Sequence, residues 1–138
     1  MLKDRYDFPA LLHYTRDGRI GITFPDLPGC VSQAHSDGEA VAMATEALEL
    51  HIYGMEQSET PVPNPSRLSE IPTEPDQRTI LVTAIMPLVR EDMETKAVKK
   101  TLTIPAWLNR AAEAAHVNFS ALLQRSLREH LGIQDRYR

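Results

Sequence analysis

Four carboxylates in the first third of the chain, Asp17, Asp26, Asp37 and Glu39, are the residues best suited to metal-dependent chemistry. Such a group could hold Mg²⁺ for phosphodiester hydrolysis, so an Mg²⁺-dependent nuclease acting on RNA or hybrids is one hypothesis. Each also has a structural explanation: Asp17 suits a turn, Asp26 a loop bounded by prolines, and the other two a helix start. We therefore predict no catalytic residue and no enzymatic activity.

The histidines and the cysteine do not indicate a metal site or a nucleophile. The five histidines are scattered, and none is paired at metal-ligand spacing near Cys30. Cys30 has no basic neighbour in the sequence, which favours a small semi-buried thiol. A single cysteine also excludes an internal disulfide framework. We predict no metal and no cofactor.

Residues 99–104 suit contact with nucleic acid. If they form a strand, Leu102 and Ile104 point to one face, while Lys99, Thr101 and Thr103 point to the other. Lysine neutralises phosphates, and threonine hydroxyls can bond to base edges. A two-stranded ribbon of such segments fits the major groove of DNA.

The charge of the chain is divided unevenly along its length. The net formal charge is −4. Residues 1–95 hold 7 Lys and Arg against 16 Asp and Glu, or −9, whereas residues 96–138 hold 8 against 3, or +5. This asymmetry is typical of a protein in which one part meets phosphates and the other a different partner.

The first half of the chain predicts strands followed by a helix. One strand face carries Tyr6, Phe8, Ala10, Leu12 and Tyr14, and after the Asp17-Gly18 turn a second carries Ile20, Ile22 and Phe24. A third strand is expected near residues 30–33. Ser36 with Glu39 forms a capping box, and the apolar stripe of the following helix is Val41, Ala44, Leu48, Ile52 and Met55.

The second half begins with a proline-rich surface connection over residues 56–78. Residues 79–86 are apolar on both faces, which favours a buried strand. Half of residues 88–97 are charged and little in this segment can be buried, so we expect a flexible coil that acts as a hinge. Two helices are predicted after Pro105, the second capped by Asn118 at its start and Gly132 at its end.

The last forty residues offer one strand and two helices, which is too little to form a core alone. A lone strand also leaves its N–H and C=O groups unpaired, and pairing with the same strand of a second chain repairs this. We therefore expect a homodimer, with Trp107 packed against the companion subunit.

The segment from Lys99 to Pro105, with the two helices and Asn118-Phe119-Ser120 at the second helix start, resembles the ribbon-helix-helix DNA-binding domain. The resemblance implies that Lys99, Thr101 and Thr103 read bases. It also implies that a phosphate is held at the second helix start, by Asn118, Phe119 and Ser120.

The first half is similar to the HicB antitoxin family, through the hairpin, Phe24-Pro25-Asp26-Leu27-Pro28-Gly29-Cys30 and the helix containing Ala47-Leu48-Glu49-Leu50. This implies an α+β protein whose βββαβ domain is a reduced, inactive ribonuclease-H-like fold, followed by a dimeric ribbon-helix-helix domain. Such proteins neutralise a HicA ribonuclease toxin and repress their own operon.

The expected organisation is a toxin-binding domain over residues 1–88, a hinge over 89–97 and a DNA-binding domain over 98–138. The expected partners are a HicA-type toxin, operator DNA, and further copies forming a dimer and a dimer of dimers. No apolar run is long enough to cross a membrane, the N-terminus does not resemble a secretory signal, and a cytoplasmic location is expected. Besides the nuclease, an orphan repressor without a toxin partner is an alternative.

Overall fold

The computed structural model describes residues 2–133, which form a four-stranded antiparallel sheet and four α-helices. The mixed α+β class is as predicted. The chain divides into two compact units, Met1–Ala97 (unit 1) and Val98–Arg138 (unit 2). No helix among the described residues is long and apolar enough to cross a membrane.

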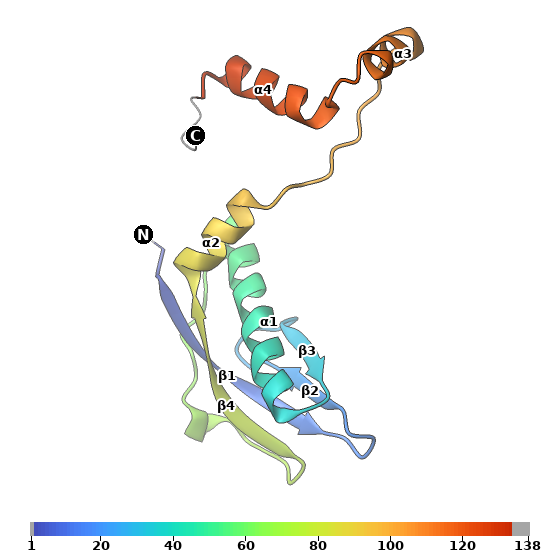
Figure 1. Ribbon diagram of the computed structural model, residues 1–138. Coiled ribbons are helices and arrows are strands. Elements are labelled where there is room, and N and C mark those ends of the chain that lie inside the picture. The colour runs from blue at the N-terminus through green and yellow to red at the C-terminus, as the bar shows by residue number, and fades with distance from the viewer. Residues whose placement is uncertain (1, 134–138) are drawn as a thin grey trace. The chain divides into compact units, whose positions relative to one another are not determined.

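The sheet of unit 1 has the strand order β3-β2-β1-β4 (Figure 1). Its strands are β1 (Arg5–Tyr14), β2 (Ile20–Thr23), β3 (Val31–Ala34) and β4 (Gln77–Ile85). The predicted hairpin of β1 and β2 is confirmed, with Leu12 opposite Ile22. Gly18 adopts a φ of 87° at its turn, a conformation that glycine takes without the steric cost of a Cβ.

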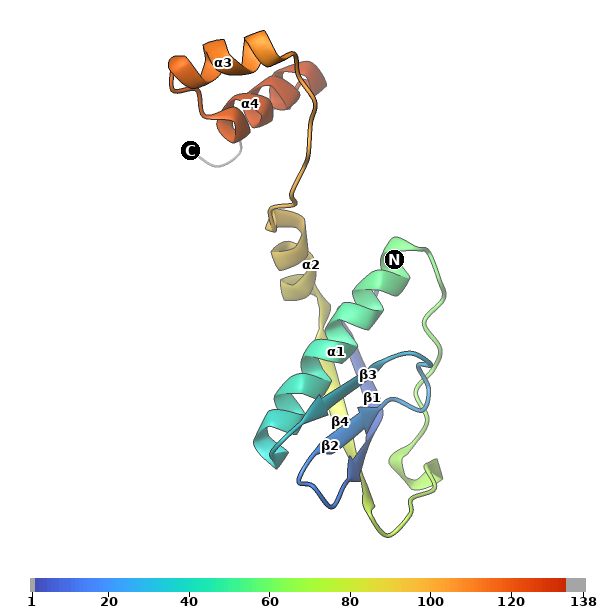
Figure 2. The ribbon, with the colours of Figure 1, turned by 90° about the vertical axis from the view of Figure 1, so that its right-hand side faces the viewer.

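Helix α1 (Asp37–Gln57) packs on one face of this sheet, and the connection after it runs on the opposite side (Figure 2). The predicted cap is confirmed, because the Ser36 hydroxyl accepts a hydrogen bond of 3.1 Å from the Glu39 N–H. The buried stripe is Ala40, Ala44, Leu48 and Ile52. Val41, predicted to be in this stripe, is exposed, because the stripe begins one residue earlier.

The hydrophobic core lies between the sheet and α1. Among the described residues its members are Phe8, Ala10, Leu12, Ile20, Ile22, Phe24, Leu27, Cys30, Ala34, Ala40, Ala44, Leu48, Ile52, Val82, Ala84, Met86 and Val89. All of them belong to unit 1, so this unit has the core that a folded domain requires.

Strand β4 lies at the edge of the sheet, and the prediction that it is buried on both faces was wrong. Val82 and Ala84 face α1 and are buried, whereas Leu81 and Ile85 on the other face are exposed. Apolar residues on both faces are typical of a central strand, but here β1 is the neighbour on one side only.

Residues 86–95 form a helix, α2 (Met86–Thr95), so the prediction of a flexible coil over residues 88–97 was wrong. Pro87 stands in its first turn, where proline is tolerated. Met86 and Val89 are buried and Met93 is partly buried, at the spacing of one helix face. The many charged residues of this segment lie beside that narrow apolar stripe.

Unit 2 contains two helices, α3 (Ala106–Ala114) and α4 (Phe119–Leu131). The predicted caps of α4 are confirmed. Asn118 accepts a hydrogen bond from the Ala121 N–H at 3.0 Å, and Gly132 ends the helix with a φ of 68°. Between the helices, His116 takes the left-handed conformation with a φ of 55°.

Candidate functional site

The extended segment of residues 99–104 in unit 2 holds three of the predicted DNA-contacting residues: Lys99, Thr101 and Thr103. All six of its residues are exposed, and it forms no strand pairing with any residue of the described chain. Its N–H and C=O groups are thus free of a β-ladder, as the sequence analysis expected before pairing with a second chain.

An open groove of about 460 Å³ separates this segment from the start of α4. Its lining residues are Lys100, Leu102, Ile104, Asn109, Phe119, Ser120, Leu122, Leu123 and Ser126. The even-numbered residues of the segment thus face α4, and Lys99, Thr101 and Thr103 do not line the groove. This alternation matches the predicted apolar and polar faces.

The start of α4 holds the other three predicted residues, Asn118, Phe119 and Ser120. Asn118 caps the helix, and its carbonyl accepts the first intrahelical hydrogen bond, from the Leu122 N–H at 3.0 Å. The N–H groups of Phe119 and Ser120 therefore lie in the first turn, where the helix offers them no acceptor. The side chains of Phe119 and Ser120 line the same groove as Leu102 and Ile104.

Unit 2 has no buried residue in either helix. Leu102 is 58% and Trp107 65% exposed, and Leu108, Phe119, Leu122, Leu127 and Leu131 are also exposed. Apolar side chains gathered in this way on about forty residues are not shielded by the unit itself. The unit as it stands has an apolar surface that a partner would cover.

The four carboxylates that could have formed an Mg²⁺ site are held by separate structural contacts. Asp17 bonds to Thr15 and Arg19, which lowers its pKa to about 2. Asp26 accepts from the N–H and hydroxyl of Ser66, at 2.9 and 2.6 Å. Tyr14 donates to Asp37 at 2.6 Å. Glu39 lies 3.8 Å from the ring of His35. Among residues 2–133, no three His, Cys, Asp or Glu side chains gather to hold a metal.

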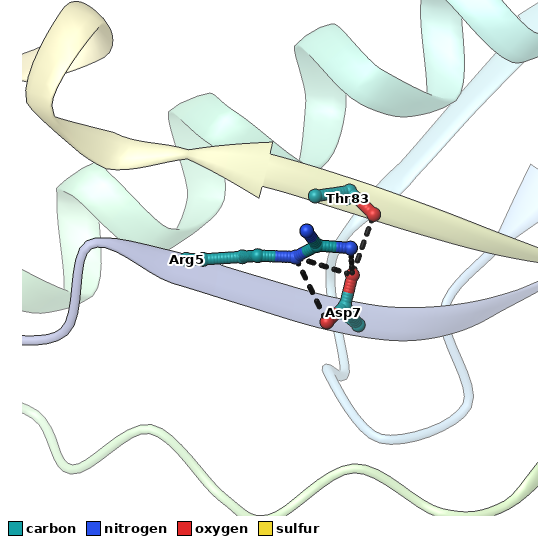
Figure 3. A network of polar contacts seen from close by, with 3 residues as sticks. All are labelled: Arg5, Asp7 and Thr83. Atoms are coloured by element: carbon teal, nitrogen blue, oxygen red, sulfur yellow. Dashed lines mark hydrogen bonds and ion pairs between the residues drawn. The ribbon is translucent and has the colours of Figure 1, made fainter.

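A polar network lies on the face of the sheet that turns away from α1 (Figure 3). The Thr83 hydroxyl donates to Asp7 at 2.5 Å, and the Arg5 guanidinium donates to both Asp7 oxygens at 3.2–3.3 Å. The Thr83 hydrogen bond, and then the one from Arg5, hold the pKa of Asp7 below its usual value. This network joins β1 to the edge strand β4.

Glu46 and Glu49 of α1 and Asp92 of α2 lie close enough together for their charges to interact. The pKa of Glu49 is raised, first by burial and then by the negative charges of Glu46 and Asp92. Unit 1 as a whole holds 8 Lys and Arg against 16 Asp and Glu, a net charge of −8. This unit therefore presents an acidic surface suited to a basic partner.

An ion pair that the sequence analysis missed anchors α2 to α1. Arg90 donates to Glu56 at 2.6 and 3.0 Å and to the backbone carbonyl of Lys3 at 2.6 Å. The side chain of Glu56 is only 2% exposed. Helical spacing of Val89 and Met93 after Pro87 was the signal that could have placed Arg90 on a packed helix.

Three comparisons relate the chain to known proteins. The family described as "HicB_like antitoxin of bacterial toxin-antitoxin system" matches residues 8–126. An uncharacterized 14.9 kDa protein of Haemophilus phage HP1 is 29% identical over 101 residues, which span 73% of this chain and 74% of that protein.

Two solved structures share the fold. A toxin-antitoxin complex from Streptococcus pneumoniae aligns with a TM-score of 0.58 and 24% identity, covering 91% of this chain and 99% of that one. The antitoxin HicB of Burkholderia pseudomallei aligns with a TM-score of 0.52 and 21% identity, covering 91% and 98%. Both alignments extend over most of the two units.

Proposed function

The chain belongs to the HicB-like family of bacterial antitoxins, and we propose that it neutralises a HicA-type ribonuclease toxin by direct binding and represses its own operon. The observation that carries the proposal is the family match over residues 8–126, which reaches from the acidic unit 1 well into the basic unit 2. The name of the Streptococcus pneumoniae neighbour, a toxin-antitoxin complex, supports a toxin partner.

Unit 1 is the part that we assign to the toxin. Its βββαβ core would be a reduced ribonuclease-H-like fold that binds and does not catalyse, since Asp17, Asp26, Asp37 and Glu39 are each engaged elsewhere. The net charge of −8 favours fast and selective association with a basic RNA-binding enzyme.

Unit 2 is the part that we assign to operator DNA, as a ribbon-helix-helix dimer. Residues 99–104 of two chains would pair as an antiparallel ribbon, and the apolar groove beside Leu102 and Ile104 would be filled by the second copy. Lys99, Thr101 and Thr103 then project from the ribbon into the major groove. The first-turn N–H groups of Phe119 and Ser120, after the Asn118 cap, would hold a phosphate.

Co-expression with the adjacent reading frame, followed by sizing of the purified complex, tests the toxin assignment. A small basic protein that co-purifies with the chain and loses its ribonuclease activity in the complex is the expected result. Absence of such a complex would favour an orphan repressor. Cleavage of labelled RNA by the chain alone, only with Mg²⁺, would favour the nuclease.

Substitution of the ribbon tests the DNA assignment. We predict that Thr101→Ala with Thr103→Ala lowers discrimination between operator and unrelated DNA by about 1–3 kcal/mol for each base contact removed, with toxin binding unchanged. Lys99→Ala is the contrasting variant. It should weaken binding to all sequences and make the log–log salt slope shallower by about 1 for each phosphate that the protein no longer neutralises. Gel shifts over a salt series measure both, and unchanged operator preference would exclude base reading by the threonines.

A further inference from the structure

The first half of β1 has one edge that the sheet of unit 1 leaves unpaired. β4 pairs with β1 from Arg5 onward, whereas β2 pairs only with residues 11–14. The Met86 N–H donates to the Asp4 carbonyl at 2.8 Å, so the even-numbered residues of β1 bond to β4. The N–H and C=O groups of Arg5 and Asp7 therefore point to the opposite side, where they meet no hydrogen-bond partner within residues 2–133.

An open groove of about 700 Å³ lies against this unpaired edge, and we refer to it as the edge groove. It is lined by Arg5 and Asp7, whose side chains lie on the face of the sheet away from α1 (Figure 3). Tyr6 and Phe8, on the α1 face, line it as well, together with Met55 near the end of α1. Because both faces of β1 reach the edge groove, it lies beside the strand and not over one face.

The proline-rich connection after α1 forms the opposite wall of the edge groove. Its lining residues are Thr60, Pro61, Val62, Pro63 and Pro65. Proline has no N–H to donate, so this segment cannot pair with β1 as the missing strand. Val62 packs against the hydrophobic core, and Ser66 bonds to Asp26 through its N–H and its hydroxyl. These contacts anchor the connection and leave the edge of β1 open.

We propose that an extended segment of the toxin occupies the edge groove and adds a strand to β1. The inference rests on the proposed function, since the toxin is the partner assigned to unit 1. In an antiparallel arrangement, one residue of the segment exchanges two backbone hydrogen bonds with Asp7, and the residue two positions away exchanges two with Arg5. The Pro9 carbonyl offers one further acceptor. An added strand of about five residues, the common length in proteins, makes these bonds.

The charges of the edge groove favour the toxin over a second copy of this chain. The lining carries Lys3 and Arg5 against Asp7, Glu56 and Glu59, a net charge of −1. The net charge of unit 1 as a whole is −8. A second unit 1 would bring the same negative charge to the edge groove, whereas a basic protein is attracted to it. The backbone groups of β1 then bind the segment without requiring a particular side chain.

Amide hydrogen exchange of the full chain, followed by NMR, tests the added strand. In the free chain, the N–H groups of Arg5 and Asp7 should exchange faster than those of Tyr6 and Phe8, which face β4. In the complex with the basic protein encoded by the adjacent reading frame, the first two should slow by about tenfold or more. Tyr6 and Phe8 are the controls, because a general stabilisation of unit 1 would slow their exchange equally.

Arg5→Pro and Arg5→Met are a matched pair of variants for the same test. Proline removes the N–H that faces the edge groove, at the first residue of a strand, where proline is tolerated. Methionine also removes the ion pair with Asp7 but keeps the N–H. We expect Arg5→Pro to bind the toxin about tenfold more weakly than Arg5→Met. Circular dichroism checks that both variants are folded.

The outcomes separate this inference from the proposed function. If the Asp7 amide exchanges as fast in the complex as in the free chain, the added strand is refuted and the toxin assignment is not. Equal affinities of Arg5→Pro and Arg5→Met for the toxin would refute it in the same way. If the native chain forms no complex with the product of the adjacent reading frame, the toxin assignment fails and this inference fails with it.

Discussion

Arg90 joins the start of the chain, the end of α1 and α2 through an ion pair that is mostly removed from solvent. Its side chain is 20% exposed, and that of Glu56 is 2% exposed. We predict that Arg90→Met lowers the free energy of unfolding by about 3 kcal/mol, because Glu56 is left buried without its cation. Urea unfolding followed by circular dichroism measures the loss.

The double variant Arg90→Met with Glu56→Gln is the control for this prediction. Removing both charges should recover most of the stability, since no buried charge stays unpaired. Arg5→Met, which breaks the exposed pair with Asp7, should cost less than about 1 kcal/mol. If the single and double variants at Arg90 unfold alike, the ion pair does not explain the stability.

Protonation of Asp7 should lower the free energy of unfolding of unit 1 at acidic pH. Its folded pKa lies below the ordinary 3.8, so its ionised form stabilises the fold above that pH. The contribution is lost as the pH falls through the lowered pKa. We predict that Asp7→Asn is less stable than the native chain at pH 7, by less than about 1 kcal/mol because Asp7 is partly exposed. The difference should shrink below pH 3.8, and thermal unfolding over a pH series would contradict the prediction if it stayed constant.

At the scale of elements, two substitutions at the start of α4 distinguish the capping role of Asn118 from the binding of a phosphate. Asn118→Asp keeps a good N-cap but adds a negative charge, whereas Asn118→Ala removes the cap, at a cost of about 1 kcal/mol. We predict that Asn118→Asp preserves the thermal stability of the chain and weakens DNA binding at low salt, because its charge repels a nearby phosphate. DNA binding equal to that of the native chain would show that no phosphate lies at this helix start.

The elements that the sequence predicted well are those set by local chemistry. The Asp17-Gly18 turn, the Ser36 cap and the Asn118 and Gly132 caps each depend on a few neighbouring residues, and all are confirmed. The position of β4 at the sheet edge was not predictable in this way, because it depends on which strands pair. The helix of residues 86–95 was missed because its apolar stripe consists of only three residues. The charged residues of the segment obscured that stripe in the sequence.

In the candidate site, likewise, the local pattern was predicted and the longer-range contacts were not. Alternation along residues 99–104 placed Leu102 and Ile104 together, and the structure sets both beside α4. Lys100 also lines that groove, although no apolar pattern in the sequence placed it there. The pairing of Arg90 with Glu56 is a contact between distant parts of the chain, which no local pattern records.

At the scale of the whole molecule, the two units differ in whether they contain a core. All the buried apolar residues described lie between Phe8 and Val89, within unit 1. We predict that a chain ending at Ala97 unfolds cooperatively at a temperature close to that of unit 1 in the full chain. It should still bind the toxin and should lose DNA binding. Calorimetry and gel shifts check these outcomes, and an unfolded fragment would show that unit 1 depends on unit 2.

If unit 2 acts as the proposed repressor, its apolar surface has a consequence for how sharply the gene would respond. If this unit becomes functional only in pairs, the amount of active repressor varies with the square of the chain's concentration at low levels. A modest fall in supply, or faster proteolysis of single copies with uncovered leucines, would then empty the promoter more than proportionally. The missing core would thus give the circuit a threshold.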